Sequence, residues 1–314
     1  MFKYVLKRLA LMIFVLFAIM TICFVLIKSL PLTVNATVGQ DAARLEAIIE
    51  SRGYRKPIME QYGIYLSRIF HGDWGVGINM EQGTYVIENF RQRLPATMLI
   101  NVYAMLLSVP VGLGLGIFAA LKKNKWQDQI ISTGVMIFIS VPSYVYAFLV
   151  QYLLCFKAGL PLQMKAGTDW LSWDMFVSVL APVLSLSFGT IAGFARYTRA
   201  ELTEVLTSDF MLLARTKGLT KAQATIRHAM RNAMVPIFPM IIGEFVGIIG
   251  GSLIIEQIFG VPGVGKLYLT SITTLDYDYF MMLSTFYTFI GLLAGILVDL
   301  SYGFIDPRIR MGAK

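Results

Sequence analysis

Six stretches of this chain are apolar enough and long enough to cross a lipid bilayer, and they limit the fold more than any other feature. They lie at about residues 9–29, 97–121, 129–155, 176–195, 236–258 and 281–303. A bilayer demands about 20 apolar residues of a helix, and backbone groups in lipid must find their hydrogen bonds inside the segment. With 56% hydrophobic and 15% charged residues, the whole chain fits the same class. The sequence therefore predicts an all-α, polytopic membrane protein with six transmembrane helices and a small external helical segment.

Basic residues gather at one end of these stretches and predict their orientation. One cluster lies in the connection at 196–235, and the others are formed by Lys3, Lys7, Arg8, Lys122, Lys123, Lys125, Arg308, Arg310 and Lys314. The positive-inside rule assigns that side to the cytosol, and an even number of spans places both termini there. The net charge of +8 is thus a topology signal and does not indicate nucleic-acid binding. The first stretch is too long for a signal peptide and no small-residue cleavage site follows, so we expect a retained span.

We expect four parts along the chain: an N-terminal transmembrane helix at 1–29, an extracytoplasmic segment at 30–95, a five-helix core at 96–303 and a cytosolic tail at 304–314. The core includes a cytosolic coupling loop at 196–235.

The external segment carries its own helical patterns. Apolar residues at helical spacing predict one short helix around Leu45–Ile49 and a second from Ile58 to Ile69, with a turn at Gly53 between them. His71–Gly77 then predicts a tight, glycine-governed turn. His71 lies beside Asp73, but no second histidine is near, so the segment lacks the converging groups that catalysis needs.

The most informative connection is residues 208–236, which we call the elbow. Ahead of Gly218, apolar residues recur at three- and four-residue steps and predict one amphipathic helix; they are Leu202, Val205, Leu206, Phe210 and Leu213. Gly218 supplies a permissive helix end, and Thr220 with Gln223 forms a capping box that starts a second helix. In that helix one face is predicted to be apolar, comprising Ile226, Ala229, Met230, Ala233 and Met234. Arg227 and Arg231 lie on the other face.

Small and ionisable residues within the spans leave alternatives open. The glycines at small-xxx-small spacing favour close helix packing, either inside the chain or at a subunit interface. They are Gly112, Gly114, Gly116, Gly243, Gly247, Gly251, Gly291 and Gly295. Glu244 is an intramembrane carboxylate, which favours either a proton-coupled transporter or a hydrogen-bonded structural role. Cys23 and Cys155 both lie in apolar stretches and are interpreted as packing residues.

One apparent nucleotide motif is rejected. Gly260–Lys266 fits most of a phosphate-binding loop, but Leu267 stands where a magnesium-binding Ser or Thr is needed and no strand precedes it. We therefore predict a turn there, followed by a short helix around Gly265–Thr273. The sequence predicts no catalytic, cofactor-binding or metal site.

Several of these segments resemble the membrane subunits of ABC importers. The elbow, with ARTKG at 214–218 and RHAMRNAMVPI at 227–237, resembles the coupling loop of peptide permeases. The acidic residue of the general motif is replaced by Leu212 and Leu213. EQIF at 256–259, followed by Pro262, Gly263 and Gly265, and DPRIR at 306–310 are similar to further motifs of that family. GDWG at 72–75 is similar to the outer segment of its first subunit.

The resemblance implies a type I ABC importer transmembrane fold in a bacterial inner membrane. It implies a non-catalytic subunit that works with a second homologous permease, two cytosolic ATPases that bind ATP and magnesium, membrane lipid and an extracytoplasmic peptide-binding protein. The residues expected to dock the ATPase are Asp209, Phe210, Ala214, Arg215, Thr216, Lys217, Gly218, Leu219 and Thr220. Those expected at an outer gate or packing site, here called the outer signature, are Glu256, Phe259, Pro262, Gly263 and Gly265. Oligopeptides are the expected substrate, and dipeptides, nickel or another small solute are the alternative substrates. An ion-coupled secondary transporter is the alternative class of protein.

Overall fold

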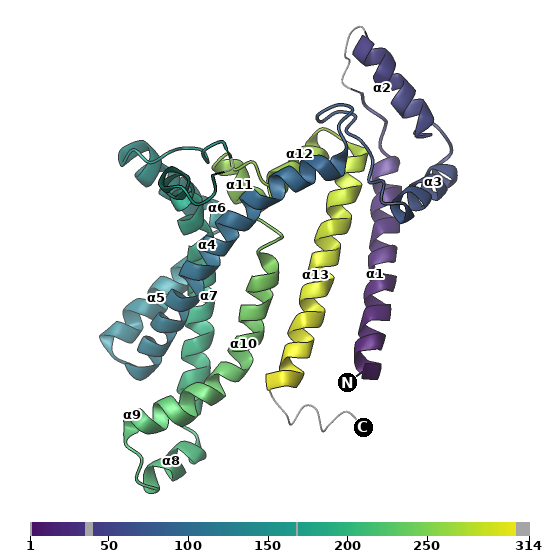
Figure 1. The fold of residues 1–314 in the computed structure, drawn as a ribbon. Helices are drawn as coiled ribbons and strands as arrows, with labels where there is room; N and C mark the ends of the chain where they lie inside the picture. The colour runs from purple at the N-terminus through teal and green to yellow at the C-terminus, as the bar shows by residue number, and fades with distance from the viewer. Residues whose placement is uncertain (1, 35–39, 168, 306–314) are drawn as a thin grey trace. The chain divides into compact units, whose positions relative to one another are not determined.

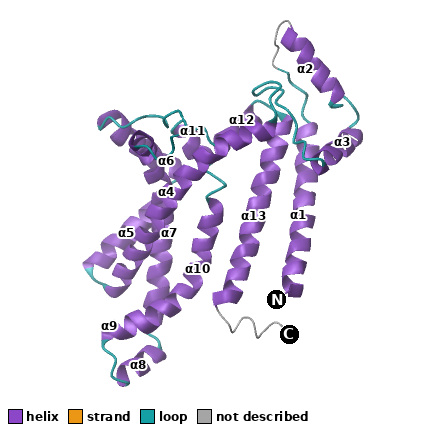
Figure 2. Ribbon diagram, viewed as in Figure 1, coloured by secondary structure: helices purple, strands orange, loops and turns teal. Residues whose placement is uncertain are grey.

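The structure is a computed structural model that describes residues 2–34, 40–167 and 169–305. Within those ranges the chain is made of helices and loops, with a single isolated antiparallel bridge between Val76 and Tyr85 (Figure 2). Five helices there are long and apolar enough to cross a membrane. A sixth candidate is a pair of helices bent by 104° at Ser140–Ser143. The all-α, multispanning prediction is confirmed.

The chain packs as two compact units, and two of the boundaries between them fall inside the long helices that contain Thr97 and Leu293. One unit comprises the chain up to Thr97, Gly250–Leu253 and Pro262–Leu293; the other comprises Met98–Ile249, Ile254–Val261 and the chain from Ala294 onward. The predicted four-part division follows membrane boundaries instead of packing and remains a prediction.

The first unit holds the two short helices predicted in segment 30–95 and parts of the long helices. Its elements are α1 (Phe2–Lys28), α2 (Gln40–Ser51), α3 (Ile58–Phe70), α12 (Val264–Thr273), the start of α4 (Val86–Leu121) and most of α13 (Tyr277–Ile305) (Figure 1). The helices predicted around Leu45–Ile49 and Ile58–Ile69 are therefore confirmed as α2 and α3. The short helix predicted after the rejected phosphate loop is confirmed as α12.

Two carboxylates at the start of α13 hold the glycine-rich turn of this unit. Asp276 accepts hydrogen bonds from the backbone N–H groups of Ile78, Asn79 and Met80 at 2.8, 2.8 and 2.9 Å. Asp278 accepts one from the N–H of Val76 at 3.0 Å. Burial raises the pKa of Asp276 to about 6, although the three N–H donors act in the opposite direction. These bonds fix the turn without regular secondary structure.

The second unit holds the remaining helices. They are α5 (Trp126–Ser140), α6 (Ser143–Val150), η1 (Gln151–Lys157), α7 (Trp173–Leu206), α8 (Asp209–Thr216), α9 (Lys221–Ala224), η2 (Thr225–Ala229), α10 (Met230–Gly247) and nearly all of α11 (Leu253–Ile258). The break between α5 and α6 falls at Pro142, which cannot donate a backbone hydrogen bond and restricts the residue before it. Pro182 lies inside α7, where it is buried.

Helix α7 is the centre of the second unit, because α5, α6 and α10 all pack against it. On the α4 side, a methyl group added at Gly112 would lie 2.6 Å from the Cβ of Phe194, and one at Gly116 would lie 2.6 Å from the Cβ of Thr198. These two glycines therefore pack inside the chain, whereas nothing lies within 4 Å of the same position at Gly114. On the α5 side, Arg199 donates to both oxygens of Asp128, at 2.5 and 2.8 Å.

The fifth predicted span needs correction. The continuous helical run extends from Lys221 to Gly247, earlier than the predicted 236–258, and the chain then leaves the helix before α11 begins at Leu253. Gly250 and Gly251 lie in that interruption, and Gly251 has a positive φ of 69° that ends a helix readily. The DPRIR sequence at 306–310 lies outside the described residues.

Candidate functional site

The elbow follows the end of α7 and comprises α8, a turn, α9, η2 and the first residues of α10 (Figure 1). Helix α7 continues to Leu206, so the first part of the predicted loop 196–235 is the end of a long helix. The helix then ends, and Thr207 and Ser208 separate it from α8. The single amphipathic helix predicted from Leu202 to Leu213 is therefore wrong: its residues belong to two helices, because the break changes the direction of the chain.

The helix end predicted at Gly218 is confirmed, and its role as a hinge stays a prediction. The φ of Gly218 is +90°. This conformation is unfavourable for residues that carry a Cβ atom but costs glycine almost no free energy. The N–H of Leu219 bonds back to the carbonyl of Ala214 at 3.3 Å, which satisfies a carbonyl at the end of α8. Thr220 and Gln223 then form both bonds of the predicted capping box, at 3.1 and 3.3 Å. The turn therefore has a defined geometry at both ends.

One side of the elbow packs on the body of the second unit. Met211 and Ala214 of α8 are buried in a cluster with Leu202 of α7, and Ala224 and Ala229 complete the same cluster. Leu219 packs on it from the turn. Small alanines let the short helices lie close to α7, so the position of α8 is set by packing as well as by the chain.

The other side of α8 exposes three large apolar residues. Phe210 is 42% exposed, Leu212 64% and Leu213 55%. We call these three residues the apolar ridge. Arg215 and Lys217 are exposed beside them. Exposed apolar residues grouped on one short helix and bordered by charge are typical of a protein interaction site. Phe210 is among the docking residues expected from the sequence, but Leu212 and Leu213 are not. The unbroken apolar run Phe210–Leu213 within a polar connection could have indicated them.

The predicted apolar face of the second elbow helix is correct only in part. Ala229 and Ala233 are buried as expected, but Ile226 is 70% exposed. The reason is η2, a π-helical turn over Thr225–Ala229, which widens the helix and moves Ile226 within it out of the α-helical register. Arg227 and Arg231 are exposed, as predicted.

A basic groove lies beside the elbow. It is formed by the end of α4, the end of α7, α8 and the start of α9, and its volume is about 590 Å³. Lys123, Lys125, Arg215 and Lys221 line it against a single carboxylate, that of Asp209. The apolar ridge and this groove together form a surface suited to a partner with apolar pockets and acidic residues.

The outer signature divides between two local structures. Glu256 and Phe259 are fully buried in the second unit, and the carbonyl of Glu256 accepts the N–H of Val261 at 2.9 Å. Gly263 is the N-cap residue of α12 in the first unit, where the next N–H, that of Val264, bonds the hydroxyl of Thr97 at 2.8 Å. Pro262 is exposed and Gly265 is buried. Both parts have packing roles, and the predicted gate role stays a prediction.

Glu244, the intramembrane carboxylate of α10, is half-buried and lies near Thr190 of α7. Its structural and proton-coupled roles both stay predictions.

Comparisons with known proteins agree with this architecture. Residues 112–311 match the family model described as "Binding-protein-dependent transport system inner membrane component". Residues 1–101 match "Binding-prot-dependent transport system membrane comp, N-term". These matches cover most of the chain, so the protein belongs to the family of inner membrane components of binding-protein-dependent transport systems.

Three curated relatives align over nearly their whole length. The chain is 33% identical over 312 residues to the dipeptide transport system permease protein DppB of Lactococcus lactis, covering 99% of this chain and 100% of that protein. It is 34% identical over 313 residues to the oligopeptide transport system permease protein OppB of Salmonella typhimurium, covering 99% and 100%. It is 30% identical over 314 residues to the glutathione transport system permease protein GsiC of Escherichia coli, covering 99% of each.

Proposed function

We propose that this chain is a membrane subunit of an ATP-driven importer for peptides. It forms half of the passage with a second, homologous permease, and an external binding protein delivers the peptide. ATP and magnesium are bound by two cytosolic ATPases, and the chain itself catalyses no reaction. The names of the three relatives, which refer to dipeptides, oligopeptides and glutathione, support a peptide substrate over nickel.

The observation that carries this proposal is the apolar ridge on a helix with defined ends. An exposed connection that only joined two spans would gain nothing from Phe210, Leu212 and Leu213 on its outer side, because water disfavours them there. Each permease subunit docks one of the two ATPases, and the ridge of this chain contributes binding free energy when it is buried in a groove of its ATPase. Met211 and Ala214 on the opposite side transmit movement of α8 to α7. The elbow is in this proposal the mechanical link between ATPase closure and tilting of the spans.

The proposed orientation follows from the same link. The elbow and both termini face the cytosol, where ATP is, and the helices α2 and α3 face the binding protein outside. The basic groove, with Lys123, Lys125 and Arg215, lies on the cytosolic side, as the positive-inside rule requires.

Co-purification with the cognate ATPases tests the docking role. We expect Phe210→Ser combined with Leu213→Ser to abolish recovery of the ATPases with the detergent-solubilised chain, because the apolar contact is lost. Leu171→Ser is the matched control, since Leu171 is 88% exposed but lies in the connection before α7. Equal ATPase recovery with the elbow variant and the control would disprove docking through the ridge.

Transport by the reconstituted assembly tests the substrate and the energy source. In proteoliposomes with the cognate binding protein, uptake of labelled di- and oligopeptides should stop with vanadate and continue with a protonophore. Uptake that stops with the protonophore alone would favour the ion-coupled alternative. Nickel uptake without peptide uptake would exclude the proposed substrate class.

A further inference from the structure

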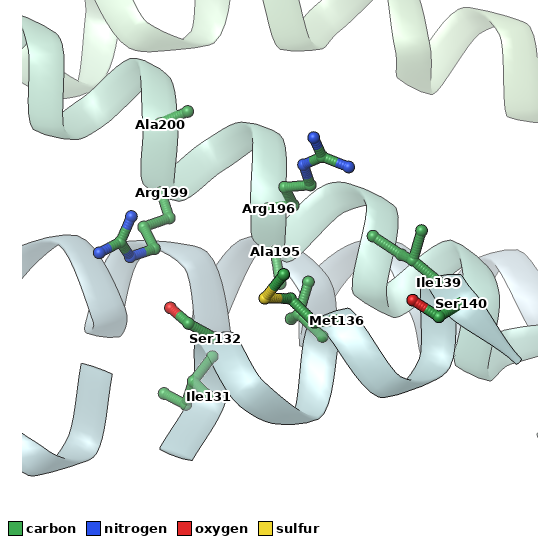
Figure 3. Close-up of a pocket in the computed structure, with 10 residues that line it drawn as sticks. Ile131, Ser132, Met136, Ile139, Ser140, Ala195, Arg196, Arg199 and Ala200 are labelled. Atoms are coloured by element: carbon green, nitrogen blue, oxygen red, sulfur yellow. The ribbon is translucent and has the colours of Figure 1, made fainter. Parts of the chain in front are cut away.

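A second concave site lies in the second unit, away from the apolar ridge. It is a groove of about 360 Å³ between α5 and α7 (Figure 3). Val135 and Ala195 form its buried floor, while Met136 and Ile139 are exposed at its edge. Its volume is at the lower end of the range of about 300–1,000 Å³ typical of small-molecule sites. Sequence analysis did not identify it, because residues of two helices more than 50 positions apart form it.

Two arginines of α7, one turn apart, border this apolar groove, and their electrostatic situations differ (Figure 3). Arg199 is neutralised by Asp128 through two hydrogen bonds. Arg196 is exposed, and among the residues that the structure describes no carboxylate forms an ion pair with it. The groove therefore presents one uncompensated guanidinium beside an apolar channel. A bidentate guanidinium is well suited to bind a phosphate group.

Arg196 directly follows the apolar stretch predicted to cross the membrane, which is where lipid headgroups are expected. The apolar stretch predicted to cross the membrane ends at residue 195, and α7 continues beyond it toward the elbow. At the elbow side of α5, the chain carries Lys122, Lys123 and Lys125, followed by the exposed Trp126. Basic residues and tryptophan at the end of a span are typical of the interface between apolar chains and headgroups.

We propose that this groove binds an anionic phospholipid of the leaflet on the elbow side. The phosphate contacts the guanidinium of Arg196, and an acyl chain lies along Val135, Met136 and Ile139. The negative headgroup compensates the one unpaired charge, and the apolar chain covers residues that are exposed without it. This assignment is independent of the proposed transport function, since it requires only that the chain lies in a bilayer.

Lipid retention measured by native mass spectrometry tests the site. The full-length chain is reconstituted in nanodiscs of equal parts phosphatidylcholine and phosphatidylglycerol, released into detergent and weighed with its bound lipids. We expect Arg196→Ala to retain phosphatidylglycerol about fivefold less, the factor for one basic residue near an anionic surface. Arg196→Lys should keep most of the binding, because the charge remains.

Arg91→Ala is the matched control, since Arg91 is exposed on α4 outside the groove and its loss changes the net charge equally. Equal loss in Arg91→Ala and Arg196→Ala, or no loss in Arg196→Ala, would overturn the proposal. A photoreactive residue at Met136 provides a second readout in intact membranes. Its crosslinks should be to lipid; crosslinks mainly to the second permease subunit would assign the groove to a subunit interface instead.

Discussion

Replacing Gly218 by valine should uncouple ATP hydrolysis from transport. The backbone at Gly218 has a φ of +90°, and nothing lies within 4 Å of an added Cβ, so the cost is backbone strain without a clash. Such strain costs about 1–3 kcal/mol in a β-branched residue. If the hinged elbow is the competent state, this free energy lowers its relative population about 5- to 150-fold. We expect the amount of peptide transported per ATP hydrolysed in proteoliposomes to decrease by a factor within that range.

The control for this variant carries the same strain elsewhere. Gly159 has a φ of +78°, also has nothing within 4 Å of an added Cβ, and lies in the second unit just after η1. Gly159→Val should lower thermal stability by a similar amount but leave the ratio of transport to hydrolysis unchanged. Gly218→Asn should have a milder effect than valine, because asparagine tolerates positive φ better. Normal coupling in Gly218→Val, or equal uncoupling in Gly159→Val, would refute the hinge.

Three further predictions concern packing and charge. Gly112→Ala and Gly116→Ala should each destabilise the chain by about 1–3 kcal/mol in graded SDS unfolding, whereas Gly114→Ala should be neutral or stabilising, because only the first two meet α7 within 3 Å. Asp128→Asn should lower the free energy of unfolding by about 1–3 kcal/mol, between the values for exposed and buried ion pairs, since Asp128 is 3% and Arg199 33% exposed. A double-mutant cycle with Arg199→Gln should give a coupling free energy, and its absence would contradict the pairing. In the folded state the pKa of Asp276 is raised to about 6 from 3.8, so the folded state binds more protons than the unfolded state between these values. The free energy of unfolding should therefore fall as the pH rises from about 4 to about 6, by about 3 kcal/mol at about 1.4 kcal/mol per pKa unit. This fall should vanish in Asp276→Asn, and equal slopes in both proteins would count against it.

Local features of the fold could be predicted from the sequence because they depend on neighbouring residues. Apolar stretches indicated the membrane helices, and helical periodicity indicated α2 and α3. The helix end at Gly218 and the capping box of Thr220 and Gln223 required only a few adjacent residues, and both are confirmed. The same holds for α12, which was predicted around Gly265–Thr273 after a glycine-rich turn and is found at Val264–Thr273.

Features that depend on distant residues could not be predicted in the same way. Ile226 was assigned to the wrong face because a π-helical turn changes the register, and no residue in Thr225–Ala229 announces one. The pairing of Asp128 with Arg199 joins positions 71 residues apart, and the anchoring of the Val76–Met80 backbone by Asp276 and Asp278 joins positions about 200 apart. Both need the packed structure before the partner becomes apparent.

The arrangement of the elbow explains why a hinge and an apolar ridge occur together. A docking helix on a long flexible loop would bind an ATPase without moving the membrane helices, because the loop would absorb the displacement. Here α8 packs against α9 and η2, and its Met211 and Ala214 are buried in one cluster with Leu202 of α7. A turn whose geometry is set at both ends follows α8. In the proposed complex, movement of a partner bound to Phe210, Leu212 and Leu213 would act on α7 through this buried cluster. It would reach α10 through the α9–η2 segment, which continues directly into α10. Coupling of this kind depends on the stiffness of the short connection, which is why the substitution at Gly218 is a sharper test than deletion of the loop.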